Sequence, residues 1–124
     1  MRFTYVRLFS DESGDSHFED VEVGLELTDF APPAAPLHVA SLGAASSLML
    51  VGADSSWRGD ELHPAPARQF VTSLFGEVEI TASDGTVRTF GPGDLVLLED
   101  TSGKGHSSRC VSPEAIFLFI PAAD

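Results

Sequence analysis

Alternation of polar and apolar residues with a period of two is the main pattern along this chain. It is clearest over residues 17–28, where valine or leucine recurs at every second position from 21 to 27. Such alternation predicts a half-buried antiparallel strand with one face in water. Residues 1–10 alternate in the same way, and residues 95–98 form a short apolar run that is typical of a buried strand.

Turn signals divide the remainder into further short strands. Ser83-Asp84-Gly85-Thr86 predicts a hairpin in which Asp-Gly supplies the positive φ angles of a type I′ turn. Gly76 interrupts a long strand pattern and predicts a bulge or bend. Since no window has a convincing helical period, we expect an all-β sandwich or barrel of roughly eight to ten strands. The other strands are expected at residues 37–42, 46–51, 69–81, 86–90, 106–111 and 115–120.

The domain organisation follows from length and from the prolines. A chain of 124 residues is the size of one ordinary domain. Residues 30–36 contain three prolines, which remove backbone donors and exclude a central strand. We therefore expect a single domain over residues 1–124, with N-terminal strands and an extended arm over residues 1–44 and the barrel core over residues 45–120.

Charge and cysteine content narrow the possible partners. The chain has 19 acidic and 7 basic residues, a formal net charge of −12. Such a surface repels phosphate backbones and anionic lipid head groups, so neither nucleic acid nor membrane is expected as a partner.

The single cysteine, Cys110, cannot form an internal disulfide and is expected in the core. Residues 1–10 lack the apolar segment of a signal peptide, and a cytoplasmic location is expected.

Two stretches, residues 57–76 and 91–106, carry the residues best suited to chemistry. In an extended chain, residues at even spacing face the same side, so His63 and Gln69 share a face, and Glu61 lies on it as well. Arg68 has the opposite parity and is expected to face away or to pair with an acidic neighbour. His17 and His38 lie in segments with no identifiable partner, and both are expected at the surface.

These stretches resemble the two motifs of the cupin family of small double-sheet jelly-roll barrels. The first motif begins with His-x-His and ends in a glutamate, six residues and a glycine. Here Gln69, six residues and Gly76 fit that frame, with His63 in the first histidine place. Ala65 stands in the second histidine place, and Gln69 stands in the place of the glutamate.

The second motif has Pro-x-Gly, two residues, a histidine and, four positions later, an asparagine. Gly103 and His106 fit it, whereas Thr101 replaces the proline and Cys110 the asparagine. The resemblance extends over the strand pattern of residues 45–120. It implies a jelly-roll barrel in which His63, Gln69 and His106 meet inside, and it implies a homodimer.

The chemistry of this site is open at the level of sequence. His63, Gln69 and His106 could hold a divalent metal (Fe, Ni, Mn, Cu or Zn), with Glu61 as an additional carboxylate. Without a metal, His63 and His106 could act as general acid and base while Gln69 orients a substrate, together with Trp57 and Lys104. We expect a small-molecule pocket, compatible with an isomerase, cyclase or dioxygenase-type enzyme; the alternative is a metal-free ligand-binding or structural module without turnover.

Overall fold

The computed structural model describes residues 1–123 and is built from strands alone in that range. This confirms the all-β prediction. No helix within residues 1–123 could span a membrane. The twelve strands are β1 Arg2–Ser10, β2 Ser16–Gly24, β3 Glu26–Thr28, β4 Leu37–Val39, β5 Met49–Asp54, β6 Arg58–His63, β7 Gln69–Phe75, β8 Val78–Ala82, β9 Val87–Phe90, β10 Leu95–Glu99, β11 His106–Cys110 and β12 Glu114–Pro121.

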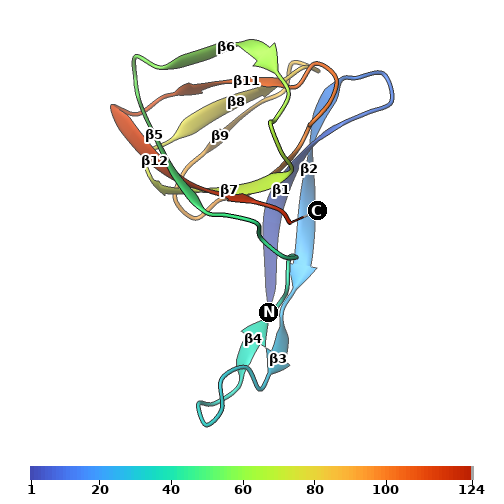
Figure 1. Ribbon diagram of the computed structural model, residues 1–124, viewed down its shortest axis with the longest axis vertical. Coiled ribbons are helices and arrows are strands. Elements are labelled where there is room, and N and C mark those ends of the chain that lie inside the picture. Colours follow the sequence, from blue (N-terminus) through green and yellow to red (C-terminus); the bar gives the residue numbers. More distant parts are fainter. Residues whose placement is uncertain (124) are drawn as a thin grey trace.

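Two sheets face each other in a sandwich (Figure 1). The larger has the strand order β2-β1-β10-β7-β12-β5, and the smaller has the order β6-β11-β8-β9. This arrangement is compatible with a jelly roll, and neither sheet closes into a barrel. β1 pairs in parallel with β10 and antiparallel with β2, so the N-terminal hairpin belongs to the larger sheet.

The chain crosses from one sheet to the other at Gly76. The predicted strand over residues 69–81 is divided there into β7 of the larger sheet and β8 of the smaller one. Gly76 has a φ of +78°, and a Cβ at this position would lie 2.3 Å from the carbonyl oxygen of Glu114. Only glycine combines this backbone conformation with so close an approach, and the predicted bend is confirmed.

Two local expectations differ from the structure. β6, whose sequence is largely polar, was not expected as a strand; it forms because it pairs with β11. The hairpin between β8 and β9 is present, but its type I′ assignment is wrong, because Gly85 has positive φ and Asp84 does not. Gly85 N–H instead donates to Ala82 O at 3.0 Å, and Ala82 N–H donates to Thr86 O at 2.9 Å.

The space between the sheets is only partly filled by the core. One cluster packs Leu8 of β1 against Ile80, Phe90 and Leu98. A second contains Cys110, which is 4% exposed, with Ala115 and Phe117; the prediction that Cys110 is a core residue is confirmed. Because Leu8 is fully buried, the N-terminal strands contribute directly to this core.

A ribbon formed by β3 and β4 projects from the sandwich (Figure 1). The alternating segment of residues 17–28 is divided at Leu25 between β2 and β3. The two strands of the ribbon pair only with each other within residues 1–123. The proline-rich residues 30–36 form the connection between them, consistent with their exclusion from the sheets.

Candidate functional site

A cavity of about 380 Å³ lies between the two sheets. Its lining is mainly apolar, with contributions from both sheets such as Val71, Ile80, Phe90 and Phe117. Trp57 is 44% exposed and lines it as well. The polar residues of the lining are His63, Gln69, Ser73, Asp94, His106 and Ser108. The structure therefore brings His63, Gln69, His106 and Trp57 to one cavity.

His63 and His106 are neighbours because β6 and β11 pair antiparallel with these residues opposite each other. Their ring centroids are 4.9 Å apart, with an angle of 50° between the planes. Gly105, directly before His106, has a φ of +71°, and a Cβ there would lie 2.0 Å from the backbone oxygen of His63. The glycine thus permits the close approach that sets the two imidazoles side by side.

Gln69 enters the cavity from the other sheet. It begins β7, opposite Leu98 of β10 and Pro121 of β12, and is only 2% exposed. No residue within 1–123 forms a hydrogen bond with its side-chain amide. A buried amide without a protein partner leaves a donor and an acceptor for a bound molecule.

Asp100 is the functional residue that sequence reasoning missed. Its side chain is fully buried, and its Oδ2 lies 2.5 Å from Nδ1 of His106. Its backbone oxygen accepts a hydrogen bond from Ala65 N–H at 2.9 Å, which ties the start of the loop after β10 to the segment before β7. Within residues 1–123, Asp100 Oδ1 is the only side-chain oxygen or nitrogen that is both completely inaccessible to solvent and without a hydrogen bond. The sequence signal was an acidic residue just after a buried apolar strand, six positions before His106.

These contacts define which nitrogen of each imidazole is basic. Nδ1 of His63 lies 3.1 Å from the backbone oxygen of Glu61, and a carbonyl can only accept, so Nδ1–H donates. Nδ1–H of His106 likewise donates to Asp100. In both neutral rings the lone pair is therefore on Nε2, and no residue within 1–123 hydrogen-bonds to either Nε2.

The fit to a divalent metal is incomplete. The two Nε2 atoms and the Gln69 amide oxygen supply two imidazoles and one neutral oxygen, without a carboxylate. Within residues 1–123, no group of three or more histidine, cysteine or acidic side chains is arranged to hold a metal ion. Glu61 does not line the cavity, and Asp100 is engaged behind His106. The described residues do not supply the donor set of a typical catalytic metal site.

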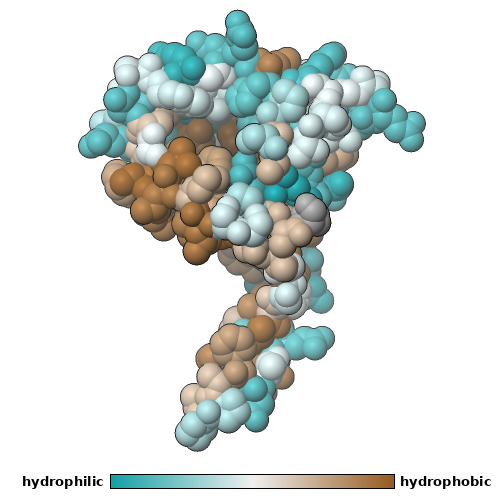
Figure 2. Space-filling view, viewed as in Figure 1, coloured by the Kyte–Doolittle hydropathy of each residue, from teal (hydrophilic) through white to brown (hydrophobic). Residues whose placement is uncertain are grey.

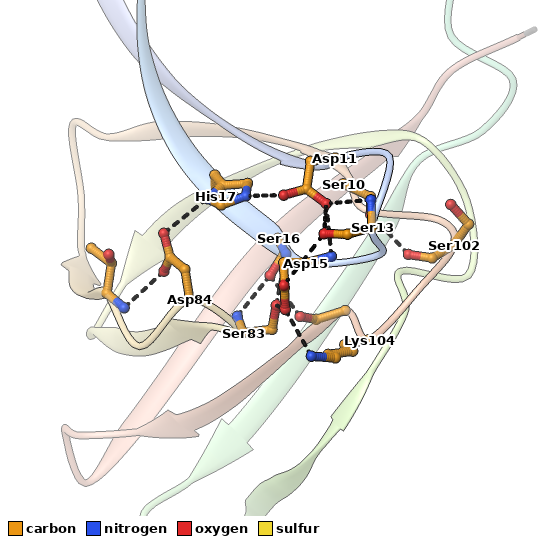
Figure 3. A network of polar contacts seen from close by, with 12 residues as sticks. Ser10, Asp11, Ser13, Asp15, Ser16, His17, Ser83, Asp84, Ser102 and Lys104 are labelled. Carbon is orange, nitrogen blue, oxygen red and sulfur yellow. Dashed lines mark hydrogen bonds and ion pairs between the residues drawn. The ribbon is translucent and has the colours of Figure 1, made fainter.

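A network of polar contacts supports the loop that carries Asp100 and His106 (Figure 3). Ser16, fully buried at the start of β2, donates from Oγ to Gly105 O at 2.7 Å, and Ser83 N–H donates to the same Oγ. Lys104 does not line the cavity; its Nζ lies 2.9 Å from Asp15 Oδ1. Lys104 therefore belongs to the loop support, and no contact links it to the candidate site.

His17 lies in the same network, and the expectation that it has no partner was wrong. Its Nε2 lies 2.6 Å from Asp11 and its Nδ1 3.0 Å from Asp84 (Figure 3). The hydrogen bond to Asp11, followed by that to Asp84, raises the pKa of His17. Arg68, as expected, pairs with an acidic neighbour, with its Nε 2.7 Å from Glu99 Oε2.

Comparison with protein-family models and with curated proteins found no match to this chain. The site is therefore defined by its own geometry. That geometry is a mainly apolar cavity with two oriented imidazoles, one buried amide and a buried carboxylate behind one of the imidazoles.

Proposed function

We propose that this protein is a cupin-type jelly roll that binds a small uncharged carbonyl compound between its sheets and transfers a proton on it. The observation that carries the proposal is the buried Asp100–His106 pair, whose imidazole lines the cavity. A carboxylate on Nδ1–H fixes the tautomer and orientation of a histidine and stabilises the imidazolium that forms when Nε2 takes a proton. Such pairs are typical of general acid–base sites.

The cavity lining favours an uncharged ligand. It contains no lysine or arginine, its one acidic residue is Asp94, and the chain as a whole carries −12. A carboxylate or phosphate ligand would be desolvated there without a cation to pair with it. The apolar walls suit a hydrocarbon or aromatic body, and His63, His106 and Gln69 suit one polar group on it.

The proposed step is the removal of a proton from the carbon next to the carbonyl. The C–H bond breaks, Nε2 of His106 takes the proton, and the electron pair forms the enolate. The Gln69 amide N–H donates a hydrogen bond to the carbonyl oxygen as its negative charge grows. Return of the proton to the same carbon gives exchange. In a β,γ-unsaturated carbonyl compound the enolate extends to the γ-carbon, and return of the proton to that carbon, with migration of the double bond, gives isomerisation. His63, adjacent to His106, supplies the second acid or base for the latter.

A second candidate is a binding module without turnover. The unpaired amide of Gln69 favours it, because a buried amide needs a ligand partner whether or not chemistry follows. Both candidates use one cavity and one ligand class, and they differ in whether Nε2 of His106 exchanges a proton with the ligand.

The test is a panel of small ketones and aldehydes, with matched carboxylates such as cyclohexanone against cyclohexanecarboxylate. Ligand binding is followed by NMR, and hydrogen–deuterium exchange beside the carbonyl is followed in D2O. We expect binding of carbonyl compounds and exchange by the unaltered protein and by His38→Gln, a control on the projecting ribbon. We expect no exchange by His106→Gln. Binding without exchange would establish the second candidate, and preference for carboxylates would contradict both.

The alternative that His63, Gln69 and His106 hold a divalent metal is tested separately. Elemental analysis of the purified protein is compared with that of a His63→Ala, His106→Ala double variant. Stoichiometric Fe, Ni, Mn, Cu or Zn that disappears in the variant would replace the metal-free proposal. We expect the metal content to be substoichiometric in both proteins, since the donor set lacks a carboxylate.

A further inference from the structure

Residues 30–53 contain no aspartate, glutamate, lysine or arginine. In a chain of 124 residues of which 21% are charged, a stretch of this length would ordinarily contain several charges. Residues 30–39 belong to the projecting ribbon and its connection, and residues 40–53 lead into and include most of β5 at the edge of the larger sheet. Such a stretch is ordinarily buried, because solvated segments are usually rich in polar and charged residues.

This uncharged stretch is nevertheless exposed within the single chain. Phe30, in the connection between β3 and β4, is 63% exposed, and Leu37 of β4 is 53% exposed. Leu48 before β5 and Leu50 within it are 67% and 70% exposed. Figure 2 shows apolar residues gathered on one side of the sandwich and again along the ribbon, while the rest of this face is mainly hydrophilic. The exposed side chains thus form two apolar surfaces, one that projects and one on the sandwich.

The ribbon cannot account for its own stability. An isolated two-stranded ribbon is marginal in water and needs a further layer to pack on. β3 and β4 pair only with each other within residues 1–123. At the same time β5 is an edge strand with apolar side chains, and exposed edges of this kind pair readily with another chain. One chain therefore offers both an apolar projection and an apolar surface that lacks a cover.

We infer that the uncharged stretch of residues 30–53 is the interface between two copies of this chain, with the ribbon of each copy packed on the Leu48–Val51 surface of the other. An exchange of this kind is self-complementary, as a two-fold dimer requires. Charge supports a second copy as the occupant. Two chains of −12 repel each other over most of their surfaces, and this stretch permits close approach without opposing carboxylates.

Other occupants fit less well. A cationic partner would choose the acidic surface in preference to an uncharged one. A lipid surface would be met by apolar residues flanked by lysine or arginine, whereas the charged residues nearest the stretch are Asp29 and Asp54. Met49 and Val51 of the receiving strand line the cavity, but the exposed side chains on which the inference depends, Phe30, Leu37, Leu48 and Leu50, do not.

Sedimentation analysis over a range of concentrations tests the inference. We expect a species of twice the 13.2 kDa chain mass, and a dissociation constant at least about 100-fold weaker in Phe30→Asp, Leu37→Asp, because each carboxylate would be buried without a partner. The matched control is Val87→Asp at an exposed position of β9, which should dimerise like the unaltered protein. Circular dichroism establishes that each variant is folded.

Leu50→Glu provides a second variant, on the receiving surface, should the ribbon variant fail to fold. It should weaken association to a similar extent. A protein that is monomeric at all concentrations would overturn the inference. Binding of that monomer to anionic or neutral vesicles would then assign the uncharged stretch to a lipid surface. A dimer that survives both sets of substitutions would also overturn it, since its interface would then lie elsewhere.

Discussion

Oδ2 of Asp100 lies 2.5 Å from Nδ1 of His106, and both side chains are excluded from solvent. The pair joins the first residue after β10 to the first residue of β11. Because Nδ1 is engaged with Asp100, Nε2 is the nitrogen of His106 that remains available to a molecule in the cavity, beside the imidazole of His63. With Nδ1–H held by Asp100, His106 accepts a proton at Nε2, on the side of the cavity.

Asp100→Asn tests whether Asp100 holds the His106 proton on Nδ1. The amide retains the shape of the carboxylate, but its NH2 group can donate to Nδ1 and so favour the tautomer with the proton on Nε2. We expect the ¹⁵N spectrum of His106 to change from the Nδ1–H to the Nε2–H form, and exchange activity to fall by at least about 100-fold. An unchanged tautomer would show that Asp100 does not orient His106. The Asp94→Asn variant, at the one acidic residue of the cavity lining, is the control.

Gln69→Leu tests whether the buried amide is retained for a ligand. The amide has no protein partner within residues 1–123, and an apolar side chain of similar size removes a buried polar group. We expect the free energy of unfolding to rise by about 1 kcal/mol and ligand affinity to fall. Urea denaturation and ligand titration measure the two effects. A variant that loses stability and keeps its affinity would contradict this role.

Gly105→Ala tests the close approach that places His63 beside His106. The new Cβ would lie 2.0 Å from the His63 backbone oxygen, at a φ of +71°. Gly85→Ala is the matched control, because Gly85 also has positive φ but open space around it. We expect about 1 kcal/mol of destabilisation for Gly85→Ala, from the backbone conformation alone. Denaturant unfolding should give a loss for Gly105→Ala of at least about 3 kcal/mol, since backbone must move. Equal losses would show that the strands separate easily.

His17→Gln tests the network that supports the loop that carries Asp100 and His106 (Figure 3). The pKa of His17 is raised mainly by its hydrogen bond to Asp11 and next by that to Asp84. The folded state therefore favours the protonated form of His17 more than the unfolded state does. The stability that these contacts contribute is complete below the unfolded histidine pKa of about 6.5 and is lost as pH rises through the higher folded value.

The acidic partners set the lower limit of that window. The pKa of Asp11 is lowered mainly by His17, and that of Asp84 mainly by the Thr86 backbone N–H, so their contributions are lost as pH falls through the folded values. The difference in melting temperature between the unaltered protein and His17→Gln should therefore be largest between about pH 4 and 6.5 and should shrink toward pH 9. A difference that is independent of pH would show that His17 acts by packing alone. High salt should reduce the difference, because these groups are exposed.

The sequence by itself determined the strand pattern and much of the cavity lining. Alternation from Val21 to Leu25, the apolar run of β10 and the glycine at Gly76 are local signals, because period-two patterning and positive φ are properties of short segments. Parity placed His63 and Gln69 on one face, and both line the cavity. The same reasoning kept Arg68 out of the site, and it pairs with Glu99.

Only the tertiary structure decided the contacts between distant segments. The polar strand β6 exists because β11 pairs with it, and Lys104 turns to Asp15 because the loop after β1 packs on the loop before β11. Neither the burial of Asp100 behind His106 nor the partners of His17 follow from spacing, because both depend on which loops meet. Hydrophobic periodicity specifies which face of a strand is buried, whereas the identity of the neighbour across that face is set by the packing of the whole chain.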